Sequence, residues 1–364
     1  MHILIPLDSL SARVFHIPFI ALASRLRLHA ILQRTPTATN SAPDDHPAAK
    51  HFTSLDDLLA DDSLDLVVIS TPPDTHLALA RAALQAGKHV LVEKPFVPAP
   101  ADADALVALA RERGRLLCVY QNRRWDADFA TVRRLVREQA LGRVYEFETH
   151  FDRYRPARPT TWKGQLPMAQ GGGSLYDLGV HLLDQVYVLF GLPGSVSARF
   201  VNQRDGRLVT ATDGTDEPDS FSALLSYADK GLLVAVRVGI MSVETKQPRF
   251  WIRGTKGSYH KNGLDPQEDQ LKSGILASEA GFGVEDVQWA GRVCLAKPDG
   301  SIVEETCAND APPTYLEFYE LLGKALETGS EEDVPVPASQ AADVLRIVAA
   351  VKESAGSGRD VIIS

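Results

Sequence analysis

The first third of the chain alternates short apolar runs with segments whose apolar residues recur every three or four positions. The apolar runs predict buried strands, and the helical spacing predicts amphipathic helices between them. Ser54 stands three residues before Asp57 and suits the start of one of these helices. The predicted strands are residues 2–7, 28–33, 66–70, 89–92 and 116–120, and the predicted helices are residues 12–24, 54–59, 76–86 and 101–113.

This alternation predicts an α/β fold that begins with a doubly wound parallel sheet. Connections between parallel strands place helices on both faces of the sheet, so a ligand binds beyond the carboxyl ends of the strands. The candidate binding loops therefore begin near Leu7, Gln33, Ser70, Val92 and Tyr120.

The pattern changes after Trp125, where a linking helix runs to about residue 138 and longer, alternating strands follow. They predict an α+β domain with a large, open, mostly antiparallel sheet. These strands are residues 144–154, 196–201, 220–227, 231–241 and 250–252, and two C-terminal helices are residues 315–327 and 338–354. We predict two domains, residues 1–124 and 125–364, with the last helices packing back on the first domain or on the sheet.

The composition narrows the classes of function. The chain has 364 residues and a net charge of −9, whereas a polyanion binder carries clustered Lys and Arg, so nucleic acid is not an expected partner. No apolar run is long enough to cross a membrane. Cys118, Cys294 and Cys307 lie far apart, without the spacing of a disulfide framework or a metal site. We expect a cytoplasmic protein that binds no metal.

Glu93, Lys94 and Pro95 directly follow a predicted strand. A lysine at this position points its ammonium into the crevice where a cofactor meets a substrate hydroxyl, and Pro95 stiffens the turn. The alternative is an ordinary surface lysine, which is the commoner case for a lysine taken alone.

Gly171, Gly172 and Gly173 precede a predicted helix that carries Asp177 and His181 four residues apart, on one face. A neutral imidazole beside a carboxylate accepts a proton near pH 7, which alcohol oxidation requires. The glycines let the backbone approach a flat ring. The alternative is a structural Asp–His pair.

Residues 120–125, which read Tyr-Gln-Asn-Arg-Arg-Trp, stand at the predicted domain junction. Such groups suit a hydroxylated ligand and a nicotinamide carboxamide, but an ordinary hinge explains them equally well. Thr71, Pro72 and Pro73 with His76 are a weaker candidate, because they also fit a simple loop and helix start.

Together these motifs resemble the glucose-fructose oxidoreductase, inositol dehydrogenase and MocA (Gfo/Idh/MocA) family, whose hallmarks are the Glu-Lys-Pro turn and a glycine run before an Asp-x-Gly-x-His helix. The resemblance covers the whole chain and is strongest to the scyllo-inositol dehydrogenase-like branch. It is also carried by Asp184 and by residues 14–19, 70–73, 120–126 and 254–258.

The resemblance implies a Rossmann domain and a catalytic group of Lys94, Asp177 and His181. His181 is implied as general acid/base, Lys94 as the group that orients hydroxyl and cofactor, and Asp177 as the residue that fixes the substrate or His181. It also implies that the exposed sheet face packs in a homodimer or higher homo-oligomer, consistent with the apolar run 232–240. The predicted cofactor contacts are Ser9, Leu10, Ser11, Ala12, Arg34, Thr35, Thr71, Pro72, His76, Glu93, Lys94, Asn122 and Arg124, and the predicted substrate contacts are Lys94, Tyr120, Arg123, Trp162, Asp177 and His181.

The first turn departs from the family pattern. A GxGxxG or GxGxxA turn leaves room for the pyrophosphate, but residues 7–12 read Leu-Asp-Ser-Leu-Ser-Ala. Both leading glycines are missing, and Asp8 places a negative charge near the phosphates. Two explanations stay open: a misassembled gene prediction, which we favour, or a real loss of tight cofactor binding.

At the end of the second predicted strand, Arg34 and Thr35 stand where an acidic residue would bind a ribose 2′-hydroxyl. Arginine there favours a 2′-phosphate, so we expect NADP, with NAD as the alternative. The alternative role for Arg34 is to cap a solvated strand end.

Three functions compete. The leading hypothesis is an NAD(P)-dependent oxidoreductase acting on a sugar, an inositol-like polyol or a related hydroxyl or carbonyl compound. The altered first turn motivates a non-catalytic sensor or regulatory binding protein of the same fold. A scaffold without ligand would make the glycine run and the Glu-Lys-Pro turn coincidences.

Overall fold

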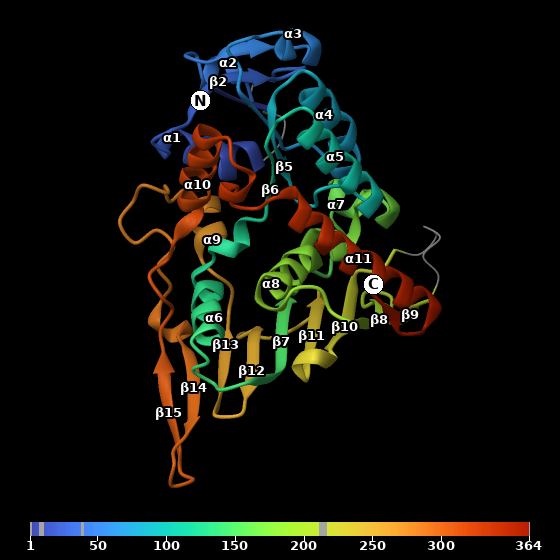
Figure 1. The fold of residues 1–364 in the computed structure, drawn as a ribbon, viewed down its shortest axis with the longest axis vertical. Coiled ribbons are helices and arrows are strands. Elements are labelled where there is room, and N and C mark those ends of the chain that lie inside the picture. Colours follow the sequence, from blue (N-terminus) through green and yellow to red (C-terminus); the bar gives the residue numbers. More distant parts are fainter. Residues whose placement is uncertain (1, 7–10, 38–39, 211–216, 364) are drawn as a thin grey trace. The chain divides into compact units, whose positions relative to one another are not determined.

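The computed structural model describes residues 2–6, 11–37, 40–210 and 217–363, with the backbone alone at residues 2–6, 162 and 163. Its internal contacts divide the chain into two compact units, drawn in Figure 1. Unit 1 comprises Met1–Trp125, Gln267–Phe282 and Pro313–Ala342, and unit 2 comprises Asp126–Pro266, Gly283–Pro312 and Asp343–Ser364. We predicted domains of residues 1–124 and 125–364 with the last helices packing back on the first domain or on the sheet; the first segment of unit 1 ends at Trp125, and residues 313–342 also belong to unit 1.

Unit 1 is built on a parallel sheet with the strand order β3-β2-β1-β4-β5-β6. Its strands are β1 (His2–Pro6), β2 (Arg27–Leu32), β3 (Lys50–Phe52), β4 (Leu66–Ile69), β5 (His89–Glu93) and β6 (Leu117–Tyr120). The order reverses between β1 and β4, and sheets of this kind bind their ligands at the carboxyl ends of the strands beside such a reversal. This sheet confirms the predicted fold class; the short strand β3 was not predicted.

The helices of unit 1 follow the predicted alternation closely. Ser54 accepts a hydrogen bond from the backbone N–H of Asp57 at 3.5 Å, which confirms the predicted helix start. The predicted helix 12–24 begins with a π-helical turn. The helices are η1 (Ala12–His16), α1 (Ile17–Leu22), α2 (Ala42–Asp45), α3 (Leu55–Leu59), α4 (Pro73–Gln85), α5 (Pro100–Glu112), η2 (Asn122–Trp125), α9 (Gln267–Lys272), α10 (Thr314–Thr328) and η7 (Glu331–Asp333).

Aromatic burial explains why α10 belongs to unit 1. The Tyr319 ring stacks on Phe19 of α1 at 6.0 Å, and Phe318 meets Tyr120 of β6 edge to face at 5.0 Å. All four rings are almost fully buried. Burial of rings of this size dominates the stability of a core, so the sequence position of α10 matters less than its apolar face.

Unit 2 contains a large sheet with the order β15-β14-β13-β12-β7-β11-β10-β8-β16, in which β9 also pairs with β8. The pairs are antiparallel except β7 with β11, which confirms the predicted, mostly antiparallel sheet. The strands are β7 (Val144–Asp152), β8 (Ser195–Asn202), β9 (Arg207–Val209), β10 (Ser220–Tyr227), β11 (Leu232–Gly239), β12 (Pro248–Gly254), β13 (Gly257–Asn262), β14 (Gly291–Ala296), β15 (Ile302–Cys307) and β16 (Val361–Ile362).

Helix α8 contacts β7 and β11, and α6 contacts α8, so these helices cover one face of the sheet (Figure 1). A buried ion pair joins the layers, because Arg249 of β12 donates to Asp128 of α6 at 2.8 Å and to Gln185 of α8 at 2.8 Å. The helices are α6 (Ala127–Arg137), α7 (Trp162–Gln165), η3 (Met168–Gln170), η4 (Leu175–Gly179), α8 (Val180–Phe190), η5 (Ala228–Lys230), η6 (Val287–Trp289) and α11 (Ala338–Ser357), whose first five residues belong to unit 1. None of the helices in the described part of the chain has the length and apolar character needed to cross a bilayer.

Candidate active site

Glu93 ends β5, and Lys94 stands at the carboxyl edge of the parallel sheet, as the sequence predicts. The Lys94 side chain is half-buried, and the peptide bond from Lys94 to Pro95 is cis. The backbone N–H of Lys94 donates to Glu93 Oε2 at 2.9 Å. The carboxylate of Glu93 therefore holds the backbone that carries the predicted catalytic lysine.

The other carboxylate oxygen of Glu93 accepts from two side chains of the first helical segment. Ser11 Oγ donates to Glu93 Oε1, and His16 Nε2 lies 3.0 Å from the same oxygen. His16 Nδ1 lies 2.6 Å from Tyr319 Oη, and the Tyr319 hydroxyl donates to the Phe15 carbonyl at 3.1 Å. We call Ser11, His16, Glu93 and Tyr319 the Glu93 network.

Two opposing effects set the pKa of Glu93. Burial raises it, but the hydrogen bond and charge of His16, the hydrogen bond from Ser11 and the charge of Lys94 together bring the pKa below its usual value. Burial also raises the pKa of Tyr319 well above its usual value. Glu93 is thus an ionised, fully hydrogen-bonded carboxylate at neutral pH, and Tyr319 remains protonated.

The predicted cofactor contacts at the first turn are only partly described. Ser9 and Leu10 lie outside the described residues, and so do Leu7 and Asp8, the other residues at which the first turn differs from the family's glycine pattern. Ser11 donates to Glu93, and Ala12 is fully buried at the start of η1. Arg34 and Thr35 follow β2 and are exposed.

His76 joins two of the binding loops. Its Nδ1 lies 3.0 Å from the carbonyl oxygens of Pro95 and Phe96, and its Nε2 lies 2.8 Å from the carbonyl oxygen of Thr71. Burial lowers the pKa of His76. The ring therefore ties the loop after β4, which contains Thr71 and Pro72, to the loop after β5, a backbone role that the sequence did not suggest.

Residues of η2 also have internal partners in unit 1. Arg123 donates to Glu268 of α9, and Arg124 Nη1 donates to Gln340 Oε1 at 2.7 Å. Tyr120 Oη donates to the Phe15 carbonyl at 2.9 Å, and Asn122 is buried. These partners give the segment a structural role at the end of β6, and its predicted ligand contacts stay predictions.

In unit 2 the backbone conformation and close packing require glycine at all three positions of the glycine run. Gly171 and Gly173 have φ angles of 85° and 80°, which favour glycine. A Cβ atom on Gly172 would lie 1.9 Å from the carbonyl oxygen of Leu166. The glycines thus let the chain fold tightly just before η4.

Asp177 lies in η4, and His181 lies in the first turn of α8, where it is buried. The turn between them is π-helical, with the N–H of Val180 bonded to the carbonyl of Leu175. Such turns occur frequently at functional sites. Lys94 belongs to unit 1, whereas Asp177 and His181 belong to unit 2.

Asp177 lines a cavity of about 360 Å³ within unit 2. The cavity wall also contains Gly173, Ser174 and Gln165. Its charged lining residues are Arg153, Arg155, Arg158, Asp177, Arg204, Glu217 and Asp219. The arginines and Glu217 were not predicted, because no single motif marks them. The predicted substrate contact Trp162 lies in α7, and its side chain is outside the described residues.

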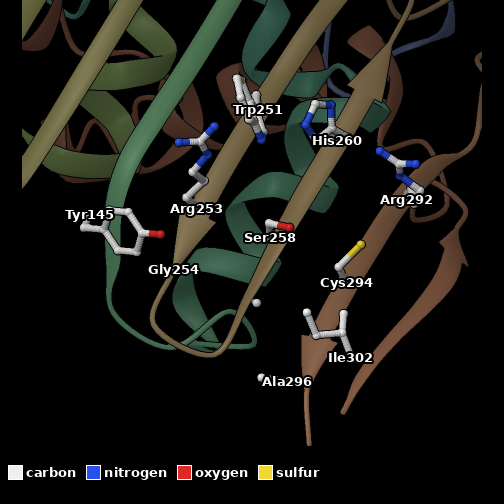
Figure 2. Close-up of a pocket in the computed structure, with 11 residues that line it drawn as sticks. Tyr145, Trp251, Arg253, Gly254, Ser258, His260, Arg292, Cys294, Ala296 and Ile302 are labelled. Carbon is white, nitrogen blue, oxygen red and sulfur yellow. The ribbon is translucent and has the colours of Figure 1, made fainter. Parts of the chain in front are cut away.

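A second hollow, of about 400 Å³, lies on the unit 2 sheet. Figure 2 shows side chains of β12, β13 and β14 around it, among them Trp251, His260, Arg292 and Cys294. The Arg253 guanidinium lies 3.8 Å from the centre of the Trp251 ring. Over the described residues, no group of three or more His, Cys, Asp or Glu side chains is arranged to hold a metal ion.

The carboxyl edge of the unit 1 sheet suits a dinucleotide. Its strand order has the switch point between β1 and β4 at which such cofactors bind. Arg34, Thr71 and Lys94 follow β2, β4 and β5 and offer one guanidinium, one hydroxyl and one ammonium at that edge. This donor set matches the phosphates and ribose hydroxyls of a nicotinamide dinucleotide.

Two family models match the chain. Residues 9–121 match "Oxidoreductase family, NAD-binding Rossmann fold", and residues 133–363 match "Oxidoreductase family, C-terminal alpha/beta domain". Unit 1 thus contains an NAD(P)-binding Rossmann fold, and residues 133–363 match the C-terminal domain of the same oxidoreductase family.

Curated relatives and solved structures match over nearly the full chain. An uncharacterised oxidoreductase of Schizosaccharomyces pombe, C115.03, is 37% identical, with 96% of each chain covered. The scyllo-inositol 2-dehydrogenase (NADP(+)) IolW of Bacillus subtilis is 31% identical, covering 97% of this chain and 93% of the relative. The structure of the oxidoreductase YvaA from Bacillus subtilis superposes with a TM-score of 0.87 at 30% identity, covering 100% of this chain and 98% of that one.

Proposed function

Because this chain belongs to the Gfo/Idh/MocA family of oxidoreductases, we propose that it moves a hydride between NADP and a carbon that bears a hydroxyl, on a sugar, an inositol-like polyol or a related compound. One observation carries the proposal: Asp177, four residues before His181, lines a cavity of substrate size that has several charged residues in its wall. Ligand cavities typically measure about 300 to 1,000 Å³.

The bound cofactor supplies the hydride acceptor for oxidation and the hydride donor for reduction. His181 takes the hydroxyl proton as the alcohol is oxidised and returns it in the reverse direction. Asp177 orients the substrate hydroxyls or the His181 ring, and the Lys94 ammonium donates to the reacting oxygen. The Glu93 network contributes by holding the Lys94 backbone through the 2.9 Å bond to Glu93 Oε2.

The choice of NADP rests on Arg34 and Thr35. Both are exposed beyond β2, where a guanidinium suits a 2′-phosphate, and the Bacillus subtilis relative is named as an NADP(+) enzyme. Titration of the purified chain with NADPH and NADH, followed by cofactor fluorescence, tests this choice. We expect NADPH to bind more tightly, and Arg34→Gln to remove the difference; tighter binding of NADH would contradict the assignment.

A non-catalytic sensor is the second candidate, and the missing glycines at residues 7 and 9 favour it. The same titration on a Leu7→Gly, Ser9→Gly double variant separates the two. Micromolar binding by the unaltered chain supports an enzyme. Binding only after the glycines are restored supports a chain that has lost cofactor binding.

Turnover of a panel of sugars and polyols tests the catalytic roles. We expect His181→Asn to lower kcat by about 10²- to 10⁴-fold without changing the cofactor titration. Lys94→Met should lower kcat and weaken cofactor binding together. His260→Asn and Lys50→Met are matched controls and should retain activity. Clear cofactor binding with no turnover of any member of the panel would overturn the enzyme assignment.

A further inference from the structure

Three arginines follow β7 and line the unit 2 cavity. They are Arg153, Arg155 and Arg158. Arg153 and Arg155 are two residues apart in an extended segment whose N–H groups donate to the carbonyls of Gly239 and Ile240, at 2.8 Å and 2.7 Å. Side chains two residues apart in extended chain point the same way, whereas Tyr154 between them is 56% exposed. Both residues therefore leave the segment on the same side and line the cavity, and the Arg153 guanidinium lies 4.5 Å from the centre of the Phe151 ring.

A fourth arginine fixes the position of this segment. Arg204 donates to the carbonyl oxygens of Arg155, Pro156 and Ala157 at 2.7 Å, 3.0 Å and 3.2 Å. It also donates to Asp219 Oδ2 at 3.0 Å. Arg204 thus makes at least four hydrogen bonds to protein groups. The residues beside Arg155 are held before any ligand arrives, which lowers the entropy lost on binding.

The charged residues that line the cavity differ in whether they have an ion-pair partner. Arg204 is paired with Asp219, and Arg158 is paired with Asp205 at 2.9 Å. Within the described residues, no carboxylate lies within ion-pair distance of Arg155. Among the same residues, Glu217 Oε2 is buried and has no hydrogen-bond partner. The cavity therefore holds a cation that suits an anion and a carboxylate oxygen that suits a hydroxyl donor.

From these groups, the geometry points to a substrate that carries an anionic group, a carboxylate or a phosphate, on a polyhydroxylated carbon chain. Arg155, together with Arg153, binds the anionic group, and Glu217 accepts a hydrogen bond from a hydroxyl. The inference rests on the proposed function, because Asp177 lines the same cavity. A guanidinium matches both anions through paired N–H donors, which a neutral polyol does not use.

Binding of matched six-carbon compounds tests the inference. D-gluconate, D-glucose 6-phosphate, the neutral polyol sorbitol and inorganic phosphate are titrated calorimetrically into the full chain with NADPH present. We expect gluconate or glucose 6-phosphate to bind at least about tenfold more tightly than sorbitol and inorganic phosphate, the effect of one charge-assisted hydrogen bond. Preference for gluconate identifies a carboxylate site, and preference for glucose 6-phosphate identifies a phosphate site.

Variants assign the effect to the cavity. Arg155→Gln should abolish the preference, weakening the preferred anion about 10- to 100-fold and sorbitol little. Arg155→Lys should keep part of it, because the charge remains without the paired donors. Arg137→Gln removes an exposed arginine of the same unit that does not line the cavity and should leave all affinities unchanged. The inference is overturned if sorbitol binds as tightly as both sugar anions, if inorganic phosphate binds as tightly as they do, or if Arg155→Gln retains the preference.

These outcomes are independent of turnover. A separate assay supplies the same compounds with the oxidised cofactor NADP, which accepts the hydride. Binding of a sugar anion that depends on Arg155, without reduction of NADP in that assay, would contradict the proposed reaction and keep the inference about the ligand. Turnover of neutral polyols without any preference for anions would keep the reaction and contradict the inference.

Discussion

The Glu93 network in unit 1 contains a buried carboxylate, and the cavity in unit 2 contains the partly exposed Glu217 with one buried oxygen, and the two carboxylates have different partners. Each oxygen of Glu93 has a protein donor, from Ser11 and His16 on one side and from the Lys94 backbone on the other. In the cavity, one oxygen of Glu217 has no such partner among the described residues.

The difference separates two uses of buried polar groups. A network whose members satisfy each other adds stability and fixes geometry. A buried carboxylate oxygen without a donor costs stability, and one that lines a cavity stands where a ligand can supply the donor. We therefore interpret the Glu93 network as the support of Lys94 and the cavity as the place where the substrate is recognised.

The largest expected effect comes from opening the closed network. Glu93→Ala leaves Ser11, His16 and the Lys94 N–H without their acceptor, and we expect it to lower the free energy of unfolding by about 2 to 4 kcal/mol. The matched variant Glu217→Ala should change it by less than about 1 kcal/mol, because it removes an oxygen that lacks a donor. Urea unfolding of both variants checks the contrast; similar losses in the two would break it.

Glu285, a carboxylate of unit 2 that does not line the cavity, allows the pH dependence of stability to be compared with that of Glu93. Burial is the main cause that raises the pKa of Glu285 to about 7, although Lys261 Nζ donates to it at 2.5 Å. Because the folded-state pKa is raised, the folded protein favours the protonated form of Glu285. The contribution of Glu285 to the free energy of unfolding is therefore fully present below its unfolded pKa of about 4.5 and is lost as the pH rises through about 7. We expect a loss of about 1 to 3 kcal/mol across this window, absent in Glu285→Gln.

Glu93 provides a second test, because its pKa shift, and therefore its effect of pH on stability, has the opposite sign to that of Glu285. Its folded pKa is lowered, so its contribution is present above its unfolded pKa and is lost as the pH falls through the folded one. In unfolding curves measured between pH 4 and 8, Glu285 should therefore lower stability as the pH rises from about 4.5 to 7, and Glu93 should lower it as the pH falls below about 4.5. A wild-type profile that Glu285→Gln leaves unchanged would be inconsistent with the titration of Glu285.

The smallest expected effect is that of Arg155 on the chain without ligand. Arg155→Gln should shift the free energy of unfolding by no more than about 0.5 kcal/mol, because its side chain is exposed and makes no ion pair within the described residues. The same urea assay measures it beside Glu93→Ala. A loss of several kcal/mol would make Arg155 a structural residue instead of a ligand-binding one.

The parallel half of the fold was predictable because its pattern is local and repeated. Strands β4, β5 and β6 each differ by one residue from the predicted ranges, since a buried strand reads as a continuous apolar run. Strands β13, β14 and β15 were missed, because their partly exposed faces mix polar residues such as His260 and Glu304 with apolar ones. The short β3 has no apolar run at all.

The candidate site was predictable where one short motif contains the residues. Lys94, Asp177 and His181 stand in such motifs, and the strand and helix positions expected for Lys94 and His181 agree with the structure. Arg204 and Glu217 stand in no motif, because Arg204 acts on a segment 47 to 49 residues away in the sequence. The hydrogen bonds of His76 to the Pro95 and Phe96 carbonyls were also unpredictable from local sequence.

The sequence by itself determined the alternating strands and helices, the carboxyl-edge position of Lys94 and the glycine run before Asp177, because these depend on residues close together in the chain. Only the tertiary structure decided which of the two predicted partners α10 packs on, that β7 pairs in parallel with β11, and which arginines line the cavity with Glu217. Those outcomes depend on side chains that are distant in sequence and meet only when burial of apolar surface brings them together.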